Sequence, residues 1–193
     1  KERLLYAVTP RFAITSSSEQ LQEAGKLLKE FPDVYLHTHL SENKAEIAFT
    51  KELFPEGENY LAVYEQANLL QKRAVFAHGI HLEENEWKQL QKHDCSLAFC
   101  PTSNLFLGSG LFNLQKAEDL NIRVGMGTDV GAGTSFSILQ TLNEAYKVTQ
   151  LRKAFVENPL AVKPLSALKS FYLATLGGAK ALYLDDVIGN FEK

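Results

Sequence analysis

Five short apolar runs recur along the chain, and each is followed by a stretch whose apolar residues have helical spacing. The runs cover residues 4–9, 34–39, 73–78, 96–100 and 122–126. Their nearly continuous apolar character is typical of parallel strands that are buried on both faces, whereas a half-exposed strand would alternate. Strands that alternate with helices predict an α/β fold built around a parallel sheet.

The predicted helices are defined by apolar stripes and by signals at their ends. Ser16, with Glu19 three residues later, has the spacing of a capping box for the first helix. Further helices are expected within residues 44–53, 60–67, 83–93 and 111–120, and from residue 134 onward. One face of that later segment is expected to carry Ile138, Leu139, Leu142, Ala145 and Tyr146. A last helix over residues 165–175 is expected to be interrupted at Gly177 and Gly178.

The number of strand–helix units indicates part of a larger barrel. A complete (β/α)8 barrel usually needs about 250 residues. The five units here occupy about 180 of the 193 residues. A small open sheet would also fit this length, but the residues at the strand ends favour a partial barrel.

Composition excludes several classes of partner and location. The formal net charge is −3, and no run or stripe of Lys and Arg is present, so nucleic acids and anionic membranes are not expected as partners. No stretch approaches the ~18 consecutive apolar residues of a membrane span, and residues 1–3 do not resemble a signal peptide. Cys95 and Cys100 do not suggest a disulfide framework. We therefore expect a cytoplasmic protein.

Residues able to bind metals or to transfer protons stand at the carboxyl ends of three predicted strands. His39 and Glu42 follow the second strand, His78 ends the third, and Asp129 follows the fifth. The carboxyl ends of parallel barrel strands meet at one face, where such enzymes keep their chemistry. Imidazole and carboxylate groups hold a metal that activates water, and a separate carboxylate can move protons. The pattern therefore predicts a metal-dependent hydrolase.

Each of these residues also has a purely structural explanation. Glu42 could open the next helix, where its charge suits the helix dipole. Asp129 could cap a helix that starts near residue 134. His78 could be a core histidine whose polar atoms are satisfied by its neighbours. His37 is expected to point to the same side of its strand as His39, as a supporting or a filling residue.

Two other strand ends carry candidate residues, and those at the first suit a planar, polar substrate, although an arginine on a loop is also commonly just solvated. Arg11 offers a fixed cation with forked donors, and Phe12 offers an aromatic face. The pair Cys100-Pro101 reverses the order found in the zinc nucleobase deaminases and no second cysteine follows, so a cysteine zinc site is not expected. The residues after it are expected to shape a pocket wall: Thr102, Ser103 and Asn104.

Taken together, these segments resemble the amidohydrolase superfamily, and within it the members that deaminate guanine. His-x-x-Glu at residues 39–42 and Gly-Thr-Asp at residues 127–129 occur across the superfamily. The resemblance is narrowed to the members that deaminate guanine by Pro-Arg-Phe at residues 10–12 and Cys-Pro-Thr-Ser-Asn at residues 100–104. It implies that residues 1–186 form strands four to eight of a TIM-type (β/α)8 barrel with C-terminal helices. Residues 187–193 would lead toward a small β-domain.

The resemblance also implies a role for each candidate residue. His39 and Asp129 would bind one Zn²⁺ in the active site, with iron as the alternative metal. Glu42 would shuttle protons, and Asp129 would also take a proton from the attacking water. His78 would hydrogen-bond that water or the developing oxyanion.

The implied reaction is the hydrolytic deamination of guanine to xanthine and ammonia, with Arg11 and Phe12 holding the purine. The partner is then a small molecule, and the intact protein is expected to be a homodimer. Superfamily members with two metals often carry a modified lysine at the end of the strand that precedes Arg11 here. The arginine at this point therefore supports a site with one metal.

The paired His-x-His ligands of the superfamily have no counterpart in this sequence. Residues 37–39 also match the pattern His-x-His. However, the Ser-Glu-Asn at residues 41–43 matches the segment after the fifth strand of the superfamily's barrel. Catalytic zinc normally has three or more protein ligands, so we expect the 193-residue chain by itself to bind metal weakly and to be inactive. Two alternatives are open: another purine or triazine amidohydrolase, or a purine-binding α/β module without turnover, whose binding neither chelators nor Glu42→Gln would affect.

Overall fold

A five-stranded parallel sheet lies at the centre of the computed structural model, which describes residues 4–191. Its strand order follows the chain, and the strands are β1 (Ala7–Val8), β2 (Tyr35–Leu40), β3 (Ala74–His78), β4 (Ser96–Phe99) and β5 (Arg123–Met126). All four neighbouring pairs are parallel. The predicted α/β fold with a parallel sheet is confirmed, and each strand contains part of a predicted apolar run.

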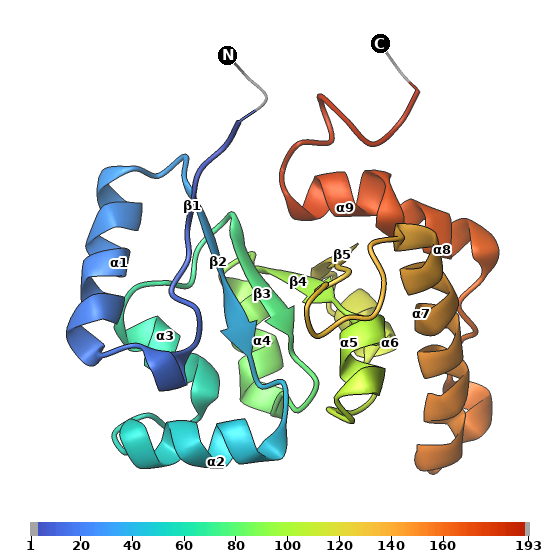
Figure 1. The fold of residues 1–193 in the computed structure, drawn as a ribbon, viewed down its shortest axis with the longest axis horizontal. Helices are drawn as coiled ribbons and strands as arrows, with labels where there is room; N and C mark the ends of the chain where they lie inside the picture. The colour runs from blue at the N-terminus through green and yellow to red at the C-terminus, as the bar shows by residue number, and fades with distance from the viewer. Residues whose placement is uncertain (1–3, 192–193) are drawn as a thin grey trace.

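Helices connect the strands and cover the sheet (Figure 1). They are α1 (Ser18–Glu30), α2 (Lys44–Leu53), α3 (Tyr60–Gln66), α4 (Glu84–Lys92), α5 (Pro101–Phe106), α6 (Leu114–Asp119), α7 (Ile138–Arg152), α8 (Ala167–Ala174) and α9 (Leu176–Ala181). Short 3-10 turns occur at η1 (Ala13–Thr15), η2 (Lys153–Phe155) and η3 (Pro159–Ala161). Helices α1 to α4 accompany the first strands, whereas α7, α8 and α9 gather at the β5 end (Figure 1). No helix among residues 4–191 is long and apolar enough to cross a membrane.

The core forms where apolar strand residues meet the helices. Leu36, Phe76 and Leu97 of three successive strands are fully buried. The Phe99 ring stacks on Phe112 with a centroid distance of 4.7 Å. Burial of each such side chain stabilises the fold by about 1.5–3 kcal/mol, so the strand ends that carry the candidate site rest on a rigid base.

The first strand is shorter and more exposed than the apolar run predicts. Only Ala7 and Val8 are in β1, and Leu4 and Tyr6 are 91% and 73% exposed. The prediction of a buried strand over residues 4–9 is therefore wrong. Within the described residues β1 pairs only with β2, so one of its edges has no neighbouring strand to continue the pairing and the burial.

The start of α1 also differs from the prediction. Ser17, not Ser16, caps the helix, and its hydroxyl accepts a hydrogen bond from the backbone N–H of Gln20. The Ser16 hydroxyl instead donates to the carbonyl of Phe12 at 2.7 Å. The 3-10 turn η1 delays the helix by about one residue, and this delay explains why the predicted Ser16–Glu19 box does not form.

The fourth strand is followed by a helix that the sequence did not predict. Pro101 ends β4, as predicted, but it also occupies the first turn of α5, a position that proline favours because its missing N–H has no helical partner there. Residues 102–104 are therefore buried residues of a helix. Cys95 and Cys100 are buried and free.

The C-terminal helices are displaced from their predicted bounds. Helix α7 starts at Ile138, capped by Ser137, and not near residue 134. Leu142 and Ala145 are buried on it as predicted, but Leu139 and Tyr146 are exposed. The buried face of this helix is instead formed by Thr141, Leu142, Ala145, Val148 and Thr149.

The predicted break at Gly177 and Gly178 falls earlier, at Thr175, and both glycines lie inside α9. A Cβ added at Gly125 of β5 would lie 3.3 Å from the Cα of Gly178, so these glycines allow the helix to approach the strand closely. Among residues 187–191 there are turns and bends but no strand, and residues 192–193 of the predicted stub lie outside the described part.

Candidate metal centre and active site

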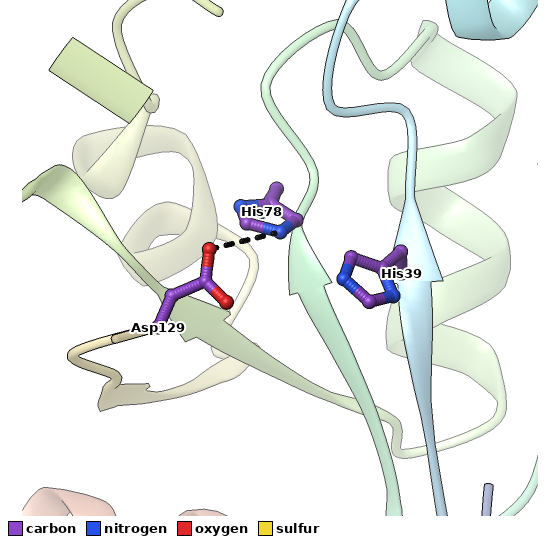
Figure 2. A group of neighbouring side chains, drawn as sticks. All are labelled: His39, His78 and Asp129. Atoms are coloured by element: carbon purple, nitrogen blue, oxygen red, sulfur yellow. Dashed lines mark ion pairs between the residues drawn. The ribbon is translucent and has the colours of Figure 1, made fainter. Parts of the chain in front are cut away.

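The three candidate strand ends meet at the carboxyl edge of the sheet. His39 lies near the end of β2, His78 ends β3, and Asp129 follows β5. One ligand atom from each of these three side chains lies within 4.8 Å of the other two (Figure 2). The prediction that the sequence brings these groups together is confirmed, and the cluster is a possible metal site.

Left-handed backbone conformations turn the chain sharply at all of these strand ends. Ser41, His78 and Asp129 have φ values of 47°, 74° and 48°, and Gly79 follows His78 at 61°. Positive φ is uncommon for residues other than glycine and concentrates at functional sites. These turns direct the ends of β2, β3 and β5 toward one another.

His39 is oriented by the segment that follows β1. Its Nδ1 lies 2.6 Å from the carbonyl oxygen of Arg11, and its ring stacks on Phe12 with a centroid distance of 3.7 Å and an interplanar angle of 14°. A carbonyl can only accept, so Nδ1 carries the proton and Nε2 presents a lone pair. This is the usual way in which a neighbouring group prepares a histidine for a metal.

His78 is fully buried and has the opposite tautomer. Its Nδ1 accepts a hydrogen bond from Asn104 Nδ2 at 2.9 Å, so Nε2 carries the proton. Burial lowers the pKa of His78 to about 4, and the neighbouring His39 adds to the shift, so the ring is neutral at pH 7. Nε2 has no hydrogen-bond partner within the described chain and lies 4.0 Å from Asp129 Oδ2 (Figure 2). The ring therefore presents an N–H donor to the opening.

Glu42 lies beside His78 as a buried carboxyl group that is only 6% exposed. Its Oε1 accepts a hydrogen bond from the Ser109 hydroxyl at 3.2 Å and lies 3.8 Å from His78 Nδ1. Burial raises its pKa, and the charges of Glu46 and Asp129 act in the same direction. A buried carboxyl group with a raised pKa is suited to take up and release protons during a reaction.

The structural explanations for these residues do not account for what the geometry shows. Helix α2 is capped by Asn43, which forms a capping box with Glu46, so Glu42 is not needed for that role. Asp129 does not cap α7, whose cap is Ser137. His78 is only half satisfied, because its Nε2 is left without a partner among residues 4–191.

The loop after Asp129 requires its glycines. A Cβ added at Gly133 would lie 1.9 Å from the carbonyl oxygen of Thr128, which no side chain could tolerate. Thr102 of α5 fixes the same loop by donating to that carbonyl at 3.1 Å. Thr102 and Asn104 thus hold Thr128 and His78 in place, and the pocket wall expected of residues 102–104 stays a prediction.

Two further residues of the site carry no signal in the sequence analysis. Ser109 lies in the loop after α5, and His81 fixes this loop because its Nε2 lies 2.7 Å from the Ser109 carbonyl. Tyr64 of α3 is buried beneath His39 and donates to the carbonyl of His39 at 2.9 Å. Ser109 lies in a loop, and Tyr64 lies within a helix of ordinary periodicity, so neither position in the sequence distinguishes a supporting residue from its neighbours.

Comparisons with known proteins agree with this geometry. The pattern of the Amidohydrolase family matches residues 1–193. Guanine deaminase of Escherichia coli is 60% identical over 189 residues, which are 98% of this chain and 41% of that protein. The chain therefore spans about two fifths of the length of this relative.

Solved structures give the same result. A guanine deaminase from C. acetobutylicum with guanine bound in the active site is 30% identical, with a TM-score of 0.88 over 95% of this chain and 43% of that one. An adenosine deaminase from Xanthomonas campestris with bound zinc is 26% identical, with a TM-score of 0.84 over 96% of this chain and 40% of that one. The sequence match over the full length and the arrangement of His39, His78 and Asp129 lead to one conclusion: the chain belongs to the amidohydrolase family.

Proposed function

We propose that the protein containing this chain deaminates guanine hydrolytically, giving xanthine and ammonia. The observation that carries the proposal is the cluster of His39, His78 and Asp129 at the strand ends, with Glu42 beside it. The names of the 60% identical E. coli relative and of the guanine-bound structure direct the choice of substrate. In this proposal residues 1–186 supply strands four to eight of a (β/α)8 barrel.

The donor set fits one divalent metal ion. His39 presents the lone pair of Nε2, and Asp129 presents a carboxylate within 4.8 Å of it. We assign the metal to these two residues, together with ligands from the rest of the protein, because His78 has its proton on Nε2 and so has no lone pair to offer there. Zn²⁺ suits nitrogen and carboxylate ligands, and when bound it lowers the pKa of water from 15.7 to about 7. Iron is the alternative.

The side chains divide the proton transfers between them. Asp129 takes a proton from the attacking water, and the His78 Nε2–H donates a hydrogen bond to the oxygen as negative charge develops on it. The water supplies both protons that are transferred. Glu42, whose pKa burial has raised, shuttles one of them to the ring nitrogen beside the attacked carbon, and Asp129 passes the other to the departing amino group. The C–O bond forms first, and the C–N bond then breaks as that oxygen becomes a carbonyl and ammonia leaves.

Arg11 and Phe12 are proposed to hold the purine. His39 stacks on one face of the Phe12 ring, so the other face and the edge of that ring are left for contact with a purine. The Arg11 guanidinium is 5.4 Å from the Phe12 ring centroid and offers several donors to a purine oxygen or nitrogen.

Ammonia release from guanine tests the proposal, with the protein containing this chain, its Glu42→Gln variant and the 193-residue chain assayed side by side. We expect turnover only by the unaltered longer protein, and Glu56→Gln, at an exposed turn, to leave that rate unchanged. Turnover of another purine or of a triazine but not of guanine would overturn the substrate. Guanine binding that survives both chelation and Glu42→Gln, without turnover, would favour a binding module.

A further inference from the structure

The hydroxyl group of Tyr64 joins three segments of backbone beneath the candidate site. The side chain, on α3, is fully buried. Its oxygen accepts a hydrogen bond from the backbone N–H of Ala13 at 3.0 Å and donates to the carbonyl of His39 at 2.9 Å. Thr38 Oγ1 lies 3.2 Å from the same oxygen and donates to the Arg11 carbonyl at 3.3 Å. One buried phenol thus donates to one backbone segment and accepts from another, with the Thr38 hydroxyl in contact with the same oxygen.

These contacts form a closed cycle of interactions around His39, the proposed metal ligand. The cycle runs from the Tyr64 hydroxyl to the His39 carbonyl. It continues through the His39 side chain, whose Nδ1 lies 2.6 Å from the Arg11 carbonyl oxygen. It returns along the backbone through Phe12 to the N–H of Ala13, and so to the Tyr64 oxygen. The orientation of His39 and the position of the Arg11–Phe12 segment are therefore coupled.

The rest of the Tyr64 side chain belongs to the core and not to the site. Its ring packs against Phe76 and Tyr60, with centroid distances of 5.7 and 5.6 Å. Burial raises the pKa of Tyr64 to about 12, so the hydroxyl keeps its proton and remains a donor at neutral pH. The packing explains a large aromatic residue at this position, but it does not require the hydroxyl.

We propose that Tyr64 is a positioning residue, whose hydroxyl fixes the tautomer and the direction of the metal-binding His39 together with the purine-binding segment Arg11–Phe12. The effect of Tyr64 on guanine binding rests on the proposed function. The effect of Tyr64 on the orientation of His39 does not. Loss of the hydroxyl would leave the Ala13 N–H buried without a partner, and it would free the β1–η1 segment to move relative to His39.

The test is Tyr64→Phe in the protein that contains this chain, with Tyr35→Phe as the matched control. Tyr35 is also buried, and its hydroxyl also donates to a backbone carbonyl, that of Leu182, but it lies at the opposite end of β2 from His39. Both variants lose one hydroxyl and its hydrogen bond to a backbone carbonyl, and Tyr64→Phe also loses the bond from the Ala13 N–H. Thr38→Val is a second, milder variant, which removes the hydroxyl between Tyr64 and the Arg11 carbonyl.

The first readout is the ¹⁵N chemical shifts of the His39 ring in the metal-free protein, and the second is the dissociation constant for zinc. We expect Tyr64→Phe to lose the single Nδ1–H tautomer of His39 and to weaken zinc binding by about 10- to 100-fold, the usual effect of removing an outer partner of a metal ligand. Thr38→Val should change both readouts in the same direction. Tyr35→Phe should lower the melting temperature without changing either.

Unchanged His39 shifts and zinc affinity in both site variants would overturn the inference, and so would an equal change in Tyr35→Phe. If the unaltered protein binds zinc and the variants behave as expected, but guanine is not deaminated, the proposed function fails while the positioning role stands. If guanine is deaminated, we expect its KM to rise in Tyr64→Phe, because Arg11 and Phe12 move with the segment.

Discussion

The side-chain amide of Asn104 donates to Nδ1 of His78 at 2.9 Å, and this contact decides which nitrogen of the buried imidazole carries the proton. With Nδ1 occupied as an acceptor, Nε2 points its N–H toward the opening that it shares with Asp129. The same ring with the other tautomer would offer a lone pair there and would act as a third metal ligand. Asn104 thus makes His78 a hydrogen-bond donor.

Replacing Asn104 with Asp is therefore expected to reduce turnover. A carboxylate can only accept, so the His78 proton moves to Nδ1 and the donor toward the developing oxyanion is lost. Loss of one such donor typically lowers kcat by about 10²- to 10³-fold, and we expect KM for guanine to change little. Steady-state kinetics of Asn104→Asp against Asn143→Asp, at an exposed position of α7, measure the effect. An unchanged kcat would show that His78 does not donate from Nε2.

Replacing Glu42 with Gln is expected to remove activity while stabilising the metal-free fold at neutral pH. Loss of a general acid–base group costs about 10²- to 10⁴-fold in rate. The pKa of Glu42 is raised in the folded state, so the folded protein binds a proton that the unfolded chain releases. The resulting penalty is absent below the ordinary pKa of a glutamate, about 4.3, and grows as the pH rises above it.

The stability of Glu42→Gln should therefore match that of the parent near pH 4 and exceed it at pH 7. Thermal unfolding of the metal-free proteins at both pH values measures this difference, with the exposed Glu56→Gln as the control. A variant that is less stable than the parent at pH 7 would contradict the raised pKa.

The parts of this site that the sequence predicts are those set by regular secondary structure. Apolar runs locate the strands within a few residues, and parallel strands bring His39, His78 and Asp129 to one edge without further information. The prediction from sequence fails where one residue has two structural roles. Pro101 ends a strand and also starts a helix, and only the second role buries Asn104 against His78.

The supporting contacts lie beyond what local sequence encodes. The partners of the Tyr64 hydroxyl, Ala13 and His39, are 51 and 25 residues away in the chain, and nothing in the helical pattern of α3 indicates them. The exposure of Leu4 and Tyr6 likewise depends on which segments pack beside β1, and the apolar run in the sequence does not indicate this. Periodicity thus predicts that the candidate residues meet at one edge of the sheet, whereas it does not indicate the residues that orient them.

Zinc is expected to stabilise the folded protein through His39 and Asp129. A ligand that binds only the folded state at 100 times its dissociation constant adds about 2.7 kcal/mol to the free energy of unfolding. Chelation should lower the melting temperature and abolish guanine turnover, and added Zn²⁺ should restore both. Asp129→Ala should lose this response, while Asp33→Ala, outside the cluster, should keep it. A metal-dependent shift that survives Asp129→Ala would place the ion elsewhere.

Arg11→Ala is expected to weaken guanine binding more than it slows the chemistry. The Arg11 side chain lies over Phe12, while its backbone carbonyl, which holds His39, is unaffected by the substitution. Hydrogen bonds from a charged donor contribute about 1.5–3 kcal/mol, so KM should rise by about 10- to 100-fold with kcat nearly unchanged. Zinc affinity should remain that of the parent, because the His39 contact is kept. A fall in kcat with KM unchanged would instead mean that the guanidinium acts on the transition state, and the assignment of Arg11 to binding would be wrong.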